Sequence, residues 1–167
     1  MSALRIHRFP DPILTRSARR VARLDRAMQR LIQGMLAVMR SQPRCVGLAA
    51  PQIGHAWRVA VMDASVHPHG PPDAQRLVLV NPSLELLGER DVRREGCLSV
   101  PDLTGNVARH RRVRLTAQDA SGAVYERLLE GFEAVVAQHE VDHLDGILFL
   151  DRVTNPARDV FKRKTSQ

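Results

Sequence analysis

Two long segments of the chain place apolar residues at helical spacing. The first covers about Asp25 to Arg40, with Asp25 in a suitable N-cap position and Pro43 just beyond its end. The second covers about residues 131–144 and is followed by Gly146, a typical C-terminal stop. Both segments are predicted to be helices. The apolar stripe of the first consists of Leu24, Met28, Leu31, Ile32, Met35, Val38 and Met39.

Between these two helices the pattern changes to short runs typical of β-strands. The proline-rich segment 65–73 is predicted to be a surface loop, and Asp119–Gly122 a turn. A short helix is expected after Pro12, and one or two helical turns from Pro156. The predicted strands are Val46–Ala50, Trp57–Met62, Arg76–Val80, Ser83–Leu87, Arg112–Ala117 and Val124–Leu129.

Strands in the middle of the chain with helices at both ends indicate an α+β fold. The sequence has 167 residues and shows no internal repeat or linker, so we expect one domain covering residues 1–167. The two cysteines are too few for a disulfide framework and fit a reducing compartment. The N-terminal residues have no apolar signal core and no segment could span a bilayer, so a cytoplasmic protein without a membrane partner is expected.

The second predicted helix carries the motif His139-Glu140-Val141-Asp142-His143. Residues four apart on a helix lie about 40° apart around its axis, so the two histidines project from one face. Two imidazoles in this arrangement can hold one metal ion, and Glu140 can then reach a water bound to the ion. Because the motif also occurs by chance, the case depends on a third ligand.

The position of that third ligand separates two kinds of enzyme. A common zinc peptidase takes it downstream, but Leu144–Gln167 contains no Glu, His or Cys. Upstream, Glu95–Ser99 contains Cys97 next to Gly96, which lets the backbone approach closely. A lone cysteine is more often a small buried apolar residue. With two histidines lacking a partner, Cys97 is nevertheless the favoured ligand, and Cys-His-His binding leaves one tetrahedral position open.

The net charge of +7 raises the question of an acidic partner. Basic runs lie at Arg16–Arg23 and Arg109–Arg114. They favour contact with nucleic acid or another acidic surface, but polar and apolar residues alternate from Arg112 onward as in a solvated strand face. Since no aromatic residues are interleaved for base stacking, the solvated face is the favoured interpretation, and no DNA partner is expected.

Three motifs in order resemble those of the peptide deformylase family. They are Val46–Gln52 (VGLAAPQ), Glu95–Ser99 (EGCLS) and Gln138–His143 (QHEVDH). The resemblance covers nearly the whole chain. It implies mostly antiparallel sheets packed around a central metal-binding helix. One departure is Cys45, where the family usually has glycine, and a positive φ at that position would strain a cysteine.

This resemblance implies removal of the formyl group from the N-terminal formyl-methionine of nascent polypeptides, with release of formate. Such N-terminal processing belongs to protein biosynthesis in the cytoplasm. It implies Glu140 as proton carrier, with the Gln52 amide and the Leu98 N–H as oxyanion donors. The metal ligands would be Cys97, His139 and His143. The substrate-binding residues would be Val46, Gly47, Gly96, Val135 and Val136.

The implied cofactor is one divalent ion. The resemblance points to Fe²⁺ as the working ion, with Zn²⁺ replacing it on oxidation, and the donor set suits both ions. The implied partners are N-formylmethionyl nascent peptides, and contact with the ribosome is compatible with the basic charge. The alternative is a metallopeptidase of the His-Glu-x-x-His type. A non-enzymatic RNA-binding module would explain none of the three motifs.

Overall fold

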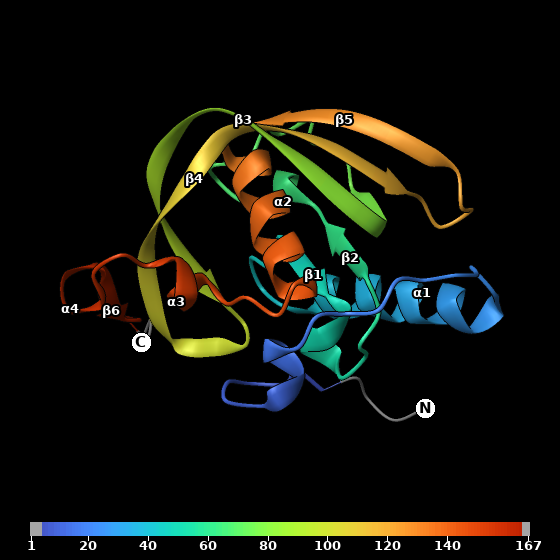
Figure 1. The fold of residues 1–167 in the computed structure, drawn as a ribbon, viewed down its shortest axis with the longest axis horizontal. Coiled ribbons are helices and arrows are strands. Elements are labelled where there is room, and N and C mark those ends of the chain that lie inside the picture. The colour runs from blue at the N-terminus through green and yellow to red at the C-terminus, as the bar shows by residue number, and fades with distance from the viewer. Residues whose placement is uncertain (1–4, 165–167) are drawn as a thin grey trace.

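A bent antiparallel sheet surrounds the helix α2 (Gly131–Leu144) in the computed structural model, which describes residues 5–164 (Figure 1). The strand order is β1-β2-β3-β4-β5, and β6 pairs with β4 on a separate branch. This arrangement is α+β and antiparallel, as predicted. The strands are β1 (Gly47–Ala49), β2 (Val59–Met62), β3 (Leu77–Cys97), β4 (Val100–Gln118), β5 (Val124–Glu130) and β6 (Val160–Lys162).

Helix α1 (Arg26–Ser41) agrees with the predicted helix to within one residue at each end. The carboxylate of Asp25 accepts a hydrogen bond of 2.9 Å from the N–H of Met28, which satisfies one of the free donors at the helix start. The helix covers β1 and β2 through an apolar stripe close to the predicted one. Its buried residues are Met28, Ile32, Met35, Leu36 and Met39.

The long hairpin of β3 and β4 differs from the sequence-based prediction. The predicted strands Arg76–Val80 and Ser83–Leu87 are parts of one strand, interrupted by a register shift at Asn81-Pro82. Asn81 adopts a φ of 50°, and its side chain bonds the N–H and the C=O of Val21 at 2.8 and 2.9 Å. From residue 88 to 94 the strand is largely exposed, so no alternating burial pattern revealed it.

Helix α2 lies in the hollow of the sheet, where ten of its fourteen residues are buried (Figure 1). Its polar residues Gln138, Glu140, Asp142 and His143 are among the buried ones. Buried polar groups cost free energy unless they are paired, so a helix of this composition requires specific partners around it.

After α2 the chain forms α3 (Phe149–Arg152) and α4 (Pro156–Asp159) and then returns to the sheet as β6. The helical turn predicted from Pro156 is confirmed by α4, whereas α3 and β6 were not predicted. Strand β6 pairs with β4 from Leu103↔Lys162 to Gly105↔Val160, the part of β4 whose other side pairs with Glu95 and Gly96 of the EGCLS motif. Within residues 5–164, no helix is both long and apolar enough to cross a membrane.

Candidate active site

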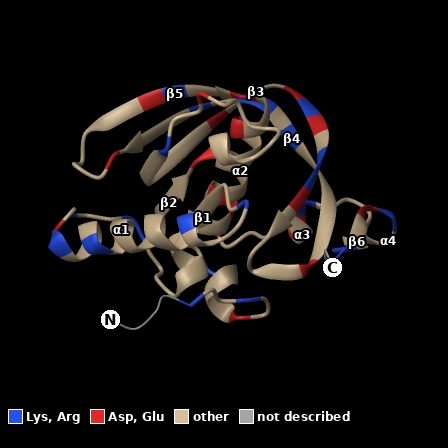
Figure 2. Cartoon of the chain, turned by 180° about the vertical axis from the view of Figure 1, so that it is seen from behind, with Lys and Arg blue, Asp and Glu red and all other residues tan. Residues whose placement is uncertain are grey.

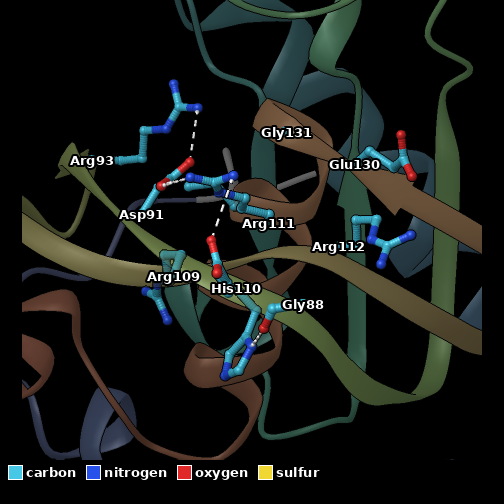
Figure 3. Close-up of a pocket in the computed structure, with 11 residues that line it drawn as sticks. Gly88, Asp91, Arg93, Arg109, His110, Arg111, Arg112, Glu130 and Gly131 are labelled. Atoms are coloured by element: carbon cyan, nitrogen blue, oxygen red, sulfur yellow. Dashed lines mark hydrogen bonds and ion pairs between the residues drawn. The ribbon is translucent and has the colours of Figure 1, made fainter.

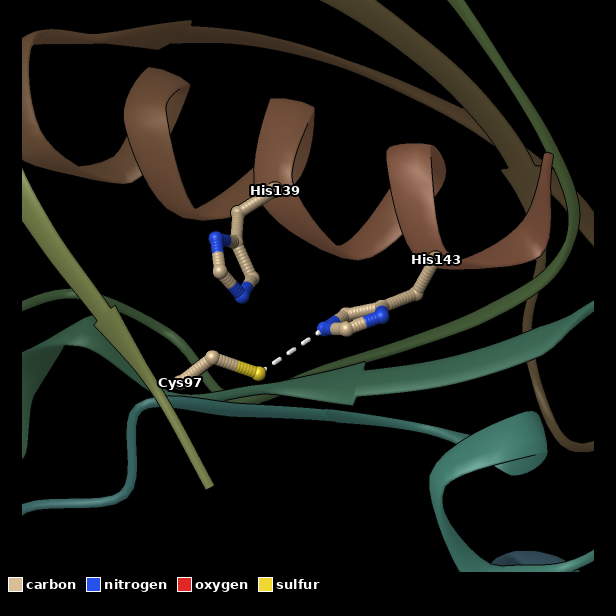
Figure 4. Close-up of side chains that lie close together, drawn as sticks. All are labelled: Cys97, His139 and His143. Atoms are coloured by element: carbon tan, nitrogen blue, oxygen red, sulfur yellow. Dashed lines mark hydrogen bonds between the residues drawn. The ribbon is translucent and has the colours of Figure 1, made fainter. Parts of the chain in front are cut away.

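The three predicted metal ligands meet at one point, although they come from two elements. Helix α2 presents His139 and His143 from one face, and the end of β3 presents Cys97 (Figure 4). One ligand atom from each residue lies within 4.8 Å of the other two. The Cys97 Sγ is 3.2 Å from the His143 Nε2. Nδ1 of His139 lies 2.9 Å from Glu95 Oε2, which leaves Nε2 of His139 available to the site.

The electrostatics of this group fit a divalent cation. Burial opposes the charged form of Cys97, but the adjacent His143 and His139 outweigh it and place the pKa of the thiol well below its usual range. The thiolate is the form that binds metals. Among the described residues, Nδ1 of His143 is buried without a hydrogen-bond partner. A soft thiolate and two imidazoles, all largely removed from water, are a suitable donor set for one such ion.

Glu140 lies beside the ligands and is only 3% exposed. Burial raises its pKa to about 7, and within the described residues its Oε2 has no hydrogen-bond partner. The carboxylate packs directly against Gly47 of β1, where any Cβ would overlap it. Gly47 was predicted only to contact substrate. Its second role, making room for Glu140, could not be read from sequence because it depends on a contact between β1 and α2.

Gln52 is held with its amide nitrogen toward the ligands. Its Oε1 accepts a hydrogen bond of 2.9 Å from the Ala49 N–H, and its Nε2 donates to Ser99 Oγ at 3.2 Å. The same nitrogen lies 3.4 Å from Cys97 Sγ. Ser99 is fully buried and helps to orient Gln52, a role that sequence reasoning did not assign. Its place in the EGCLS motif was the only available signal.

A buried network of charged residues contacts the ligand His139 through Glu95. Both oxygens of Glu95 accept hydrogen bonds from Arg109, at 2.7 and 3.0 Å, and Arg109 also donates to Asp142 at 2.6 Å. Hydrogen bonds from His139 and Arg109 outweigh the burial of Glu95 and lower its pKa to about 2. Asp142 is further paired with Arg152 at 2.7 Å. The network therefore connects the ligand His139 to two strands and to α3.

Two of the three ligands, Cys97 and His139, line a pocket of about 490 Å³ together with Glu140. The predicted substrate-binding residues Val46, Gly47, Gly96, Val135 and Val136 all line it, together with Gln52 and Leu98. Phe132 also lines it and was not predicted, although it is one helical turn before Val135 and Val136. On the far wall, His67 stacks on Phe132 with ring centroids 4.6 Å apart.

The unusual Cys45 is accommodated without a left-handed backbone. The positive φ in this segment belongs to Arg44, at 58°, and Cys45 is not among the residues with positive φ. Its thiol donates a hydrogen bond of 3.1 Å to the Gly47 carbonyl. Burial, followed by the nearby Glu140, raises the pKa of Cys45 to about 12, so this thiol stays neutral. Cys45 is absent from the group of clustered metal donors.

Arg109, Arg111 and Arg114 of the basic run at 109–114 form ion pairs within the molecule, and basic and acidic residues alternate along the β3/β4 hairpin (Figure 2). A shallow cleft of about 650 Å³ lies over this part of β4 (Figure 3). There Arg111 pairs with Asp91 at 2.8 Å, and further along the hairpin Arg114 pairs with Glu85 at 2.6 Å. Arg109 points inward to the buried network instead. This surface is a solvated strand face with cross-strand pairs, which was the favoured interpretation of the run.

A thiolate and two histidines beside a buried carboxylate of raised pKa define a metal-dependent hydrolase. The polypeptide deformylase family model matches residues 3–159. The chain therefore belongs to the peptide deformylase family, whose members remove N-formyl groups from nascent peptides. A metallopeptidase is not favoured, because the third donor is Cys97, upstream of the helix, and the matched family is a different one.

Individual relatives agree with this family. The chain is 45% identical to peptide deformylase from Heliobacterium modesticaldum over 158 residues, which cover 93% of this chain and 97% of that protein. It is 40% identical to peptide deformylase from Desulforudis audaxviator over 165 residues, covering 98% and 99% of the two chains. The crystal structure of the Thermotoga maritima enzyme superposes with a TM-score of 0.83 at 35% identity, covering 93% of this chain and all of that one.

Proposed function

We propose that this protein hydrolyses the formamide bond of N-terminal formyl-methionine through Cys97, His139, His143, Glu140, Gln52 and Leu98. One observation carries this assignment: three metal donors lie within 4.8 Å of one another beside a buried carboxylate that has an unpartnered oxygen. A divalent ion held by the three donors would act as a Lewis acid that lowers the pKa of water.

Glu140 handles the protons in this proposal. It accepts a proton from the attacking water and passes it to the α-amino nitrogen as the C–N bond of the formamide breaks. The products are formate and a free α-amine. The Nε2 of Gln52 and the backbone N–H of Leu98 donate hydrogen bonds to the oxyanion that forms on the formyl group. The hydrogen bonds from Gln52 to Ser99 and Ala49 hold that donor in place before substrate arrives.

The substrate backbone is proposed to bind as an added strand. β1 pairs only with β2, and the last residues of β3 pair only with β4, so each has a free edge within the described structure. Val46 just before β1, Gly47 at the start of β1 and Gly96 on β3 line the same pocket. An extended peptide between these edges would form main-chain hydrogen bonds, and Val135 and Val136 would offer an apolar surface to the methionine side chain.

The proposed working ion is Fe²⁺, and Zn²⁺ or another divalent ion would occupy the same donors. The resemblance of the three motifs to those of the family supports iron. The donor set of one thiolate and two imidazoles is compatible with both metals. Metal analysis of protein purified without oxygen tests this choice, and zinc alone in such a preparation would contradict it.

Removing a single donor should greatly reduce metal binding. Cys97→Ala, His139→Ala and His143→Ala should each lower occupancy from about one ion per chain and weaken affinity at least ~100-fold, because three ligands hold the ion. Metal per chain after dialysis is the measurement. Cys45→Ala is the matched control and should keep its metal, because Cys45 is outside the donor group. If Cys97→Ala still bound about one metal ion per chain, Cys97 would not be a metal ligand.

The activity itself is tested by formate release from formyl-Met-Ala-Ser, measured on anaerobically purified protein together with its metal content. Hydrolysis should require bound metal and should yield one formate per free amine. Cleavage of casein, in contrast, should be absent. Casein cleavage without formate release would favour a metallopeptidase and contradict the proposal.

Because the substrate emerges from the ribosome, we propose that the protein works in the cytoplasm and contacts ribosomes through its basic surface. The net charge of +7 supports this contact. Binding to phosphates releases counterions, so association should weaken steeply as salt is added. Co-sedimentation with ribosomes at several salt concentrations is the measurement. Association that does not depend on salt, or none at low salt, would contradict the proposed contact.

A further inference from the structure

Four exposed basic side chains line the active-site pocket. Arg44 precedes β1, Arg94 is on β3, and Arg163 and Lys164 follow β6. We call these four residues the basic rim. All four line the same pocket as the metal donors Cys97 and His139. Their segments lie far apart in sequence, so the tertiary structure alone brings these charges together.

The return of the chain as β6 places Arg163 at this pocket. β6 runs beside β4 (Figure 1), and the N–H of Arg163 donates a hydrogen bond of 2.8 Å to the Asp102 carbonyl. The guanidinium of Arg163 then covers Gly96, in the space that a Cβ would fill. Arg163 thus lies over the part of β3 whose edge is proposed to bind the substrate backbone.

Within residues 5–164, no member of the basic rim has a carboxylate within 4.0 Å. Arg94 is held by neutral groups: it donates to Asn106 at 2.9 Å and stacks on Phe161, 3.6 Å from the ring centroid. The nearest carboxylates in the pocket face elsewhere. Glu95 is committed to Arg109 and His139, and Glu140 packs against Gly47. Asp159 offsets part of this charge, since Arg94 is one of the groups that lower the pKa of Asp159. With four basic side chains, the rim keeps a net positive charge.

The spacing along β3 indicates which part of a substrate would meet this charge. Gly96 and Arg94 lie one and three residues from Cys97, or about 3–10 Å along a strand. A peptide whose formyl group lies at the metal donors, and which runs along this edge, has its second and third residues at that distance. Side chains there would pass beside Arg94 and Arg163.

We propose that the basic rim makes the enzyme select formyl-methionyl peptides with an acidic side chain at the second or third residue. This inference rests on the proposed function, because it assumes that the peptide occupies the edge of β3 beside Gly96. The rim would attract such peptides electrostatically and repel basic ones. Arg163 is the central member, since its guanidinium covers Gly96.

The test compares kcat/KM for three amide-capped peptides, formyl-Met-Ala-Asp, formyl-Met-Ala-Ser and formyl-Met-Ala-Lys. Amide caps remove the terminal carboxylate, which would otherwise supply a negative charge in every case. The Asp peptide should exceed the Lys peptide by about five- to tenfold, a range set by attraction and repulsion at an exposed site. The difference should appear in KM and shrink with added salt.

In Arg163→Glu, the ratio of kcat/KM for the Asp peptide to kcat/KM for the Lys peptide should fall to one or below. Arg163→Gln should give an intermediate ratio. Arg30→Glu is the matched control: Arg30 is exposed on α1, which lies at the opposite end of the molecule from β6 (Figure 1), so the ratio should stay at the wild-type value. An unchanged ratio in Arg163→Glu, with formate still released from all three peptides, would overturn the inference alone. If metal-loaded wild-type protein released no formate from any of the three peptides, both the proposed function and this inference would be overturned.

Discussion

Glu140→Gln should retain its metal and lose turnover by at least ~10²–10⁴-fold, the usual contribution of a positioned proton carrier. Glutamine has nearly the same shape, so it can occupy the space against Gly47. It cannot accept a proton from water. The carboxylate being replaced is buried, and among the described residues one of its oxygens has no partner, so little structural cost is expected. Metal per chain and formate release on the same sample are the measurements.

Glu133→Gln is the matched control for this variant. It makes the same chemical change in the first turn of α2, outside the pocket, and should leave turnover and metal unchanged. Gln52→Leu extends the test, because it should keep the metal yet slow hydrolysis by ~10²–10³ through loss of an oxyanion donor. Near-normal turnover in metal-loaded Glu140→Gln would refute the proposed mechanism. Loss of the metal would instead reassign Glu140 as a ligand or structural residue.

Arg109→Met should destabilise the fold by about 3–5 kcal/mol, the usual cost of removing one partner from a buried ion pair. Arg109 is 4% exposed and makes two hydrogen bonds to Glu95 and one to Asp142. Methionine fills much of the volume but leaves Glu95 buried with only His139 beside it. The free energy of unfolding, measured by urea denaturation of metal-free protein, tests this prediction.

Arg111→Met is the matched control on the same strand. Its side chain is 55% exposed and pairs with Asp91 on the surface, so its removal should hardly change the denaturation midpoint. In Arg109→Met, His139 also loses part of the support for its orientation, so metal affinity should fall about 10- to 100-fold. If the two variants had the same free energy of unfolding, the buried network around Arg109 would contribute no more to stability than a surface ion pair.

The parts of the fold that were predicted correctly are those with a strong local signal. Helix α1 has a wide apolar stripe and an N-cap, and helix α2 ends before Gly146, so both were located closely. The outer half of the β3/β4 hairpin and strand β6 were missed. Strand β6 has only three residues, and the outer part of β3 is mostly exposed. In the outer part of β4, Gly105, Val107 and Arg109 are buried at alternate positions, but a glycine and an arginine do not give the apolar alternation from which a strand is recognised.

The sequence by itself determined the chemistry of the site. Helical spacing predicted that His139 and His143 share one face, and the absence of a downstream donor pointed to Cys97, which the structure places beside them. The motif residues also identified Glu140 and Gln52 as candidates. The grouping of the three donors could be predicted because it depends on residue type and on local geometry, which short-range periodicity determines.

Only the tertiary structure decided how these groups are supported and surrounded. It placed Gly47 against Glu140, buried Arg109 between Glu95 and Asp142, and brought Arg163 over Gly96. Each of these contacts joins residues far apart in the chain. Periodicity shows which face of an element is buried but not which element covers it, and that choice is made by the packing of the whole fold.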